Sequence, residues 1–176
     1  EIINQSMVDM SITVEAGDIF VIAQKIVSKS EGRLVNLTQV EPSARAIELA
    51  QATEKDPRFI ELVLRESNAV LRTRPGTIIV EHKNGFVCAN AGIDHSNVQG
   101  VWGNPEDWVL LLPEDANQSA ERIRARLIAL SGIESLGVLV IDSHGRAWRN
   151  GTVGVAIGVA GVPALVDMRG QPDLFG

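Results

Sequence analysis

The sequence predicts a mixed α+β fold, with sheets covered by helices. Two observations carry this prediction: short apolar runs at residues 19–23 and 137–141 are typical of buried strands, and residues 115–130 have the amphipathic period of a helix. The 176 residues are 45% hydrophobic and 22% charged, a composition typical of ordinary globular proteins. We therefore expect one compact unit or two small interleaved ones.

The first element expected is a helix, since apolar residues recur there at helical spacing: Ile2, Ile3, Met7 and Met10. Residues 15–18 break this pattern before the strand at residues 19–23. Residues 24–33 then combine three positive charges with serines and Gly32, which favours a polar loop after the strand end. Loops at this position commonly meet ligands.

Two covering helices are expected next. Pro42 and Ser43 begin the first, and Pro57 begins the second. Apolar residues assigned to one face of the second are Ile60, Val63, Leu64 and Val70.

Asn84 and Gly85 lie between β-rich runs at residues 77–81 and 86–89, a strong hairpin signal. A strand at residues 108–112 and the helix at 115–130 follow. The strand at 137–141 leads into a polar turn at 142–149. The apolar, glycine-rich residues 154–166 are interpreted as a buried strand.

Composition argues against several classes of partner. The net charge of -6 leaves no basic face for a nucleic acid backbone. No apolar run approaches the roughly 20 residues needed to cross a bilayer, so no membrane partner is expected. The single cysteine, Cys88, excludes an internal disulfide and is expected to be a buried thiol, which favours a cytoplasmic location.

The first segment that could carry chemistry is the sequence Asn-Ala-Gly-Ile-Asp-His-Ser-Asn at residues 90–97. It follows a strand and displays Asp94, Ser96 and Asn97 together. A turn in which these side chains cap the backbone accounts for the same residues, and for this segment alone that is the favoured interpretation.

The second segment begins with Asp142 and Ser143, directly after a continuous apolar run. A plain turn explains it equally well. However, aspartates at two distant strand ends can converge on one cation, and hard oxygen ligands suit magnesium or manganese. Such a metal would neutralise nucleotide phosphates during phosphoryl transfer.

The third segment, residues 24–33, offers lysines and hydroxyls that could hold phosphate oxygens. A solvated basic loop is favoured on composition alone. The Walker-type pattern Gly-x-x-x-x-Gly-Lys-Ser/Thr does not occur, so that kind of phosphate loop is excluded. The three histidines lack zinc-like spacing, which argues against structural zinc.

Together these segments resemble the coenzyme F-420-0:L-glutamate ligase (gamma-glutamyl ligase) family in order and spacing. Two later segments extend the resemblance over nearly the whole chain: residues 154–161, and residues 167–170 with 173–176. The resemblance implies a gamma-glutamyl ligase-like fold of mixed sheets, with two intertwined parts per subunit, and a homodimer. It also implies that residues 1–176 form the ligase domain, lacking segments at both ends.

The activity implied by the resemblance is GTP-dependent ligation of L-glutamate to the carboxylate of coenzyme F-420-0 through an acyl phosphate. Phosphorylation converts a poor electrophile into one with a good leaving group. The cofactors implied are a divalent metal, magnesium or manganese, with a monovalent cation as a further candidate. Further gamma-linked glutamates are compatible with the same chemistry.

The resemblance also implies residue roles. It assigns metal ligation to Asp94, Asp142 and Ser143, the last in place of the usual threonine. Nucleotide contacts are implied for Gln24, Lys25, Lys29 and Asn97, while no catalytic residue is assigned. Arg146 and Arg149 could bind phosphate on charge and position alone. His144 and Ala147 depart from the family pattern and are expected to alter loop shape more than ligand chemistry.

Two alternatives remain from the sequence. One is a catalytically silent nucleotide-binding module, against which the retention of Asp94, Asp142 and Ser143 argues. The other is a metal-dependent phosphohydrolase of the same fold, which would hydrolyse GTP without either acceptor.

Overall fold

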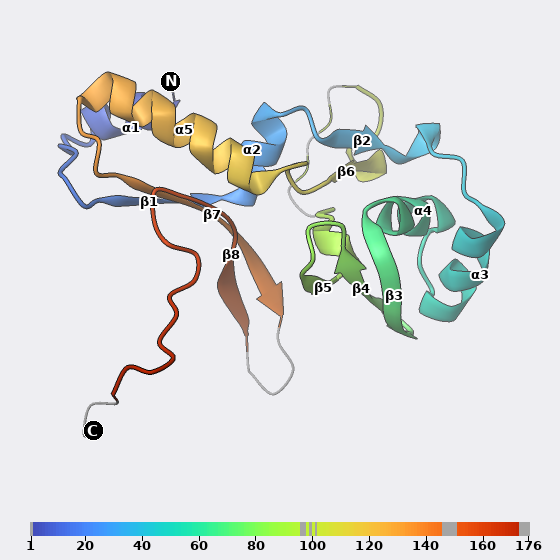
Figure 1. Ribbon diagram of the computed structural model, residues 1–176. Helices are drawn as coiled ribbons and strands as arrows, with labels where there is room; N and C mark the ends of the chain where they lie inside the picture. Colours follow the sequence, from blue (N-terminus) through green and yellow to red (C-terminus); the bar gives the residue numbers. More distant parts are fainter. Residues whose placement is uncertain (1, 96–97, 99, 101, 146–150, 173–176) are drawn as a thin grey trace.

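The structure, a computed structural model, describes residues 2–95, 98, 100, 102–145 and 151–172. It confirms the mixed α+β fold. Figure 1 shows an elongated arrangement in which helices and strands gather into two halves. The helices are α1 (Ile2–Asp9), α2 (Gln24–Ser30), α3 (Ala44–Thr53), α4 (Pro57–Arg65) and α5 (Ala116–Ser131), with short 3-10 turns η1 (Leu37–Gln39), η2 (Asn90–Gly92) and η3 (Pro105–Asp107). The strands are β1 (Ile19–Ala23), β2 (Leu34–Asn36), β3 (Ser67–Arg74), β4 (Thr77–His82), β5 (Val87–Ala89), β6 (Trp108–Leu110), β7 (Gly137–Gly145) and β8 (Thr152–Ala160).

One half is built on a three-stranded sheet of order β1-β7-β8. β1 pairs in parallel with β7, and β7 pairs antiparallel with β8. Helix α5 lies along one face of this sheet (Figure 1), where Val138 and Val140 are fully buried. The predicted helix at residues 115–130 is confirmed, and it begins where the Asp115 side chain accepts a hydrogen bond of 2.9 Å from the Gln118 backbone N–H.

The other half is the antiparallel sheet β3-β4-β5, packed against α3 and α4 (Figure 1). The predicted hairpin between β4 and β5 is confirmed. Gly85 in its turn has a φ of 85°, which a residue without Cβ adopts at little cost. Strands β2 and β6 form a separate antiparallel pair. The β4-β5 hairpin delivers the chain directly to η2, the turn that carries Asn90.

Residues 24–30 are helix α2, so the prediction of a polar loop there was wrong. Burial explains the difference: Val27 packs into the core beside α5, and Ser28 Oγ donates a hydrogen bond of 3.0 Å to Gln24 Oε1 one turn earlier. The helix ends before Gly32, which has a φ of 70°. The composition of residues 24–33 indicated correctly that many of its side chains are polar, but it did not reveal that one face of the helix is buried.

Three further interpretations were wrong. Val70 lies in β3 and not on the second helix, which ends at Arg65. Residues 142–145 extend strand β7 and do not form a turn, because they pair with β8. The strand expected at residues 154–166 ends at Ala160. Beyond it Leu165 is 93% exposed, so the apolar character of residues 161–166 was wrongly interpreted as a sign of burial.

The start of α4 provides a test of local stability. Asp56 Oδ1 accepts a hydrogen bond of 2.7 Å from the Arg58 backbone N–H, and the Arg58 side chain holds the pKa of Asp56 below its ordinary value. Asp56→Ala is expected to lower the free energy of unfolding by about 1 kcal/mol at neutral pH. Since a lowered carboxyl pKa stabilises the fold above the unfolded value of about 3.9, this difference should shrink as the pH falls from there through the lower pKa of the folded state. Urea unfolding at pH 7 and pH 3 measures it, and an equal difference at both would contradict the assignment.

Candidate functional site

A cavity of about 200 Å³ lies where the turn η2 meets strand β7. The residues that line it come from β5, η2, the segment after η2, and β7. They are Ala89, Asn90, Gly92, Ile93, Asp94, Asp142 and Ser143. The two aspartates predicted to converge therefore line one cavity, although they are far apart in the sequence.

Asp94 is held by backbone and side-chain contacts. Its backbone exchanges hydrogen bonds of 2.9 and 2.8 Å with Leu110, which is fully buried at the end of β6. Gln24 Nε2 donates a hydrogen bond of 2.7 Å to Asp94 Oδ2, and Lys25 Nζ lies 3.4 Å from Asp94 Oδ1. The start of α2 and the segment after η2 thus meet at one carboxylate.

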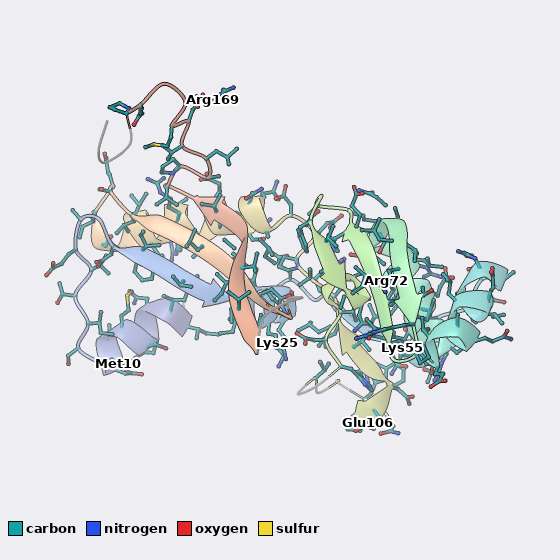
Figure 2. All side chains as sticks on the ribbon, turned by 90° about the horizontal axis from the view of Figure 1, so that it is seen from below. Met10, Lys25, Lys55, Arg72, Glu106 and Arg169 are labelled. Atoms are coloured by element: carbon teal, nitrogen blue, oxygen red, sulfur yellow. The ribbon has the colours of Figure 1, made fainter. Side chains whose placement is uncertain are left out.

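Gln24 is itself 2% exposed, and its orientation is fixed by Ser28 through the hydrogen bond to Oε1. Since that bond occupies the amide oxygen, the amide nitrogen is directed to Asp94. Figure 2 shows Lys25 at the junction between the two halves of the molecule. The residues predicted for nucleotide contact at this position are therefore adjacent to a predicted metal ligand.

The electrostatics of the cavity disfavour a bare pair of carboxylates. Burial raises the pKa of Asp94, and the negative charge of Asp142 raises it further, while Lys25 and Gln24 act in the opposite direction. Burial, followed by the charge of Asp142, also raises the pKa of Cys88 to about 11. Cys88 is buried, as expected, and its thiol stays protonated at neutral pH. A cation in the cavity would relieve the repulsion between the two aspartates.

Asp142 and Ser143 are placed by the pairing of β7 with β8, opposite Val155 and Gly154. The Ser143 backbone N–H donates a hydrogen bond of 2.8 Å to Asp142 Oδ1. The Ser143 residue is exposed at the cavity. Pairing with β8, and not a turn, therefore positions these two residues.

Lys29 is exposed on α2 and does not line the cavity. It lies one helical turn after Lys25, so the two lysines project from neighbouring positions of the same helix. Asn97, Arg146 and Arg149 lie outside the described residues. The structure thus brings together Gln24, Lys25, Asp94, Asp142 and Ser143, with Lys29 close by on the same helix.

The donor atoms at this cavity fit a hard divalent cation. Two carboxylates and a hydroxyl are oxygen ligands of the kind that magnesium and manganese prefer. Asn90 also lines the cavity. Its side-chain oxygen is buried without a hydrogen-bond partner. Within the described ranges no group of three or more His, Cys, Asp or Glu side chains could hold a metal.

A larger cavity, with a volume of about 830 Å³, lies elsewhere, between α1, α2 and α5. Among the predicted site residues that the structure describes, none lines it. Two of its charged residues, Arg122 and Glu31, already pair at 2.7 Å, and Ser119 Oγ also donates to Glu31. The smaller cavity therefore remains the candidate site on its chemistry, despite its size.

Comparison with known proteins decides the family. The model of the family described as F420-0:Gamma-glutamyl ligase matches residues 1–176. The chain belongs to this family. The resemblance inferred from separate sequence segments is thereby confirmed.

Curated relatives of the gamma-glutamyl ligase family agree. The chain is 48% identical over 166 residues to a Methanopyrus kandleri protein named Coenzyme F420:L-glutamate ligase, covering 94% of this chain and 63% of that protein. Proteins of the same name from Methanocaldococcus jannaschii and Methanothermobacter thermautotrophicus are 42% and 45% identical, covering 100% and 91% of this chain and 68% and 61% of theirs. The chain thus spans between 61% and 68% of the length of these relatives. Among the helices that the structure describes, none has the length and apolar character needed to span a bilayer.

Among the polar residues that line the cavity, Asn90 is the one that the sequence analysis did not single out. It stood inside the segment already chosen for Asp94, immediately after a predicted strand. Its left-handed backbone conformation, with a φ of 53°, could not be read from residue spacing.

Proposed function

We propose that the protein containing this chain is a GTP-dependent, divalent-metal-dependent ligase that joins L-glutamate to coenzyme F-420-0. The relatives' name supports the acceptor and the amino acid. One structural observation supports the metal and nucleotide dependence: Asp94, Asp142 and Ser143 line a single cavity. Gln24 donates a hydrogen bond to Asp94, and Lys25 forms an ion pair with it. This arrangement suits a phosphoryl-transfer site more than a simple turn.

The proposed reaction has two steps. A carboxylate oxygen of coenzyme F-420-0 attacks the γ-phosphorus of GTP, and GDP leaves. The glutamate amine then attacks the resulting acyl phosphate, which releases phosphate and a proton and forms the amide. A divalent cation would supply charge neutralisation for the phosphate oxygens.

The chain's own residues have distinct tasks in this proposal. Asp94, Asp142 and Ser143 would hold the cation, and Gln24 keeps the Asp94 carboxylate oriented through the hydrogen bond of 2.7 Å. Lys25 and Lys29 would attract the phosphate chain from one side of α2. Lys25 is already 3.4 Å from an Asp94 oxygen, so nucleotide and cation would be drawn to adjacent positions.

The decisive experiment incubates the full-length protein with GTP, magnesium, L-glutamate and coenzyme F-420-0, and detects glutamylated product by mass spectrometry. Product that depends on all four components supports the ligase. Nucleotide binding without product would favour a silent module. Phosphate release from GTP at full rate without either acceptor would instead favour a phosphohydrolase.

Lys29→Ala is expected to weaken GTP binding about tenfold while leaving divalent-metal binding in the absence of nucleotide unchanged. The expected loss reflects one charge-assisted contact to phosphate. Isothermal titration with GTP and, separately, with Mn²⁺ measures both effects. The control is Lys83→Ala, which removes an exposed lysine in the β4-β5 turn. Equal GTP affinity in the Lys29 and Lys83 variants would remove Lys29 from the site.

A further inference from the structure

Asn90 lies in a backbone conformation that is costly for most residues. Asn90 and Ala91 have φ values of 53° and 52°, and Gly92 follows with a φ of 66°. Three successive residues are therefore left-handed, and strain of about 1–3 kcal/mol is typical for each non-glycine residue so placed. Asparagine tolerates this region better than most side chains, which explains why it can begin the turn.

The turn has little freedom to relax. Ala91 is fully buried, and a Cβ added at Gly92 would lie 2.5 Å from Leu112 Cδ1. After the turn, the backbone of Asp94 is fixed by its two hydrogen bonds to Leu110. The positions of Asn90 and Asp94 around the cavity are therefore set by the same rigid segment.

The Asn90 side chain has an unmet hydrogen-bonding requirement. Its Oδ1 atom is buried without a donor, which typically costs about 1–3 kcal/mol. The carboxylates of Asp94 and Asp142 cannot satisfy it, since ionised carboxylates only accept hydrogen bonds. Asn90 lines the cavity, so a cation held there is a partner that its side-chain oxygen could take.

We propose that Asn90 supplies a neutral oxygen ligand to the divalent cation held by Asp94 and Asp142, an inference that rests on the proposed function. A cation would meet the requirement of the amide oxygen and of both carboxylates at once. Asn90 would also add a neutral oxygen to the two described carboxylates that line the cavity. Asn90 would thus have a role in binding beyond that of a turn residue.

The test separates the side chain from the turn. Asn90→Gly keeps the left-handed conformation, which glycine adopts freely, and removes only the amide. Asn90→Asp keeps an oxygen at the same position and adds charge. Asn84→Gly, at an exposed asparagine in the β4-β5 turn, is the matched control.

Mn²⁺ binding to the full-length protein, without nucleotide, is measured by the electron paramagnetic resonance signal of the free ion. We expect Asn90→Gly to raise the Kd for Mn²⁺ about tenfold. Asn90→Asp should restore a Kd at or below that of the unaltered protein, because an added carboxylate strengthens cation binding. Asn84→Gly should bind as the unaltered protein does.

Two outcomes overturn the inference in distinguishable ways. If the unaltered protein binds Mn²⁺ and Asp142→Asn weakens that binding while Asn90→Gly does not, Asn90 is a turn residue and the proposed function stands. If the unaltered protein does not bind Mn²⁺, the metal site fails and the role of Asn90 fails with it. Thermal unfolding of each variant shows whether a loss of binding reflects a loss of fold.

Discussion

Asp142→Asn is expected to reduce formation of glutamylated product by at least about a hundredfold while the fold remains intact. The change removes one of the two negative charges that the proposed site offers to a cation, and charged oxygen ligands dominate affinity for hard cations. The backbone should be unaffected, because Asp142 lies in regular pairing with Val155 and an asparagine oxygen can still accept the 2.8 Å hydrogen bond from Ser143 N–H. Product is measured by mass spectrometry at saturating GTP and magnesium.

The control for this prediction is Asp9→Asn, which makes the same chemical change at an exposed position on α1. It should leave turnover unchanged. Full activity of Asp142→Asn would discard the metal assignment. A loss of circular dichroism signal would instead show that Asp142 serves the structure of β7.

Gly158→Ala is expected to destabilise the fold by about 3 kcal/mol, at the upper end of the usual cost of overpacking. Strand β8 passes directly under the start of α5, and a Cβ at Gly158 would lie 2.2 Å from the Ala116 carbonyl oxygen. The obstacle is backbone, which cannot rotate away as a side chain can. A hydrogen bond also joins β8 to the start of α5, since the Val159 N–H donates to Asn117 Oδ1 at 3.0 Å.

Thermal unfolding should show the Gly158→Ala effect as a fall in Tm of roughly 6–12 °C. Gly154→Ala on the same strand is the matched control, because its Cβ would lie 3.6 Å from Ile141 Cδ1, an ordinary contact. Its effect should stay within about 0.5 kcal/mol. Equal stabilities of the two variants would mean that β8 and α5 do not approach each other as described.

The elements that sequence patterns predicted well are those with strong local signals. The helices expected to begin near Ser43 and Asp115 do begin there, and the Asn84-Gly85 turn joins β4 to β5. Strand β3 was missed because its burial is irregular and its register against β4 shifts twice. Helix α2 was missed because its stability depends on tertiary contacts of Val27 and Gln24, which no local propensity encodes.

The residue types of the candidate site could be predicted from the sequence, but the contacts that position those residues could not. Asp142 stood out as an acid after an apolar run, and Asp94 as part of a polar turn after a strand; both line the cavity. That Asp142 lies within a strand depends on its pairing with β8, whose residues come later in the sequence. The role of Gln24 in orienting Asp94 depends on a contact between segments distant in sequence, which periodicity cannot reveal.

The parallel pairing of β1 with β7 has a consequence for how the protein is made. β1 leaves the ribosome well before its partner strand, since its register partners begin only at Gly137. Pairings so distant along the chain close slowly. Meanwhile the nascent polypeptide carries an apolar strand whose Ile19 and Val21 remain about half exposed even after folding, at 51% and 57%. We therefore expect newly synthesised chains to be most prone to aggregation, and most dependent on chaperones, until β7 has emerged.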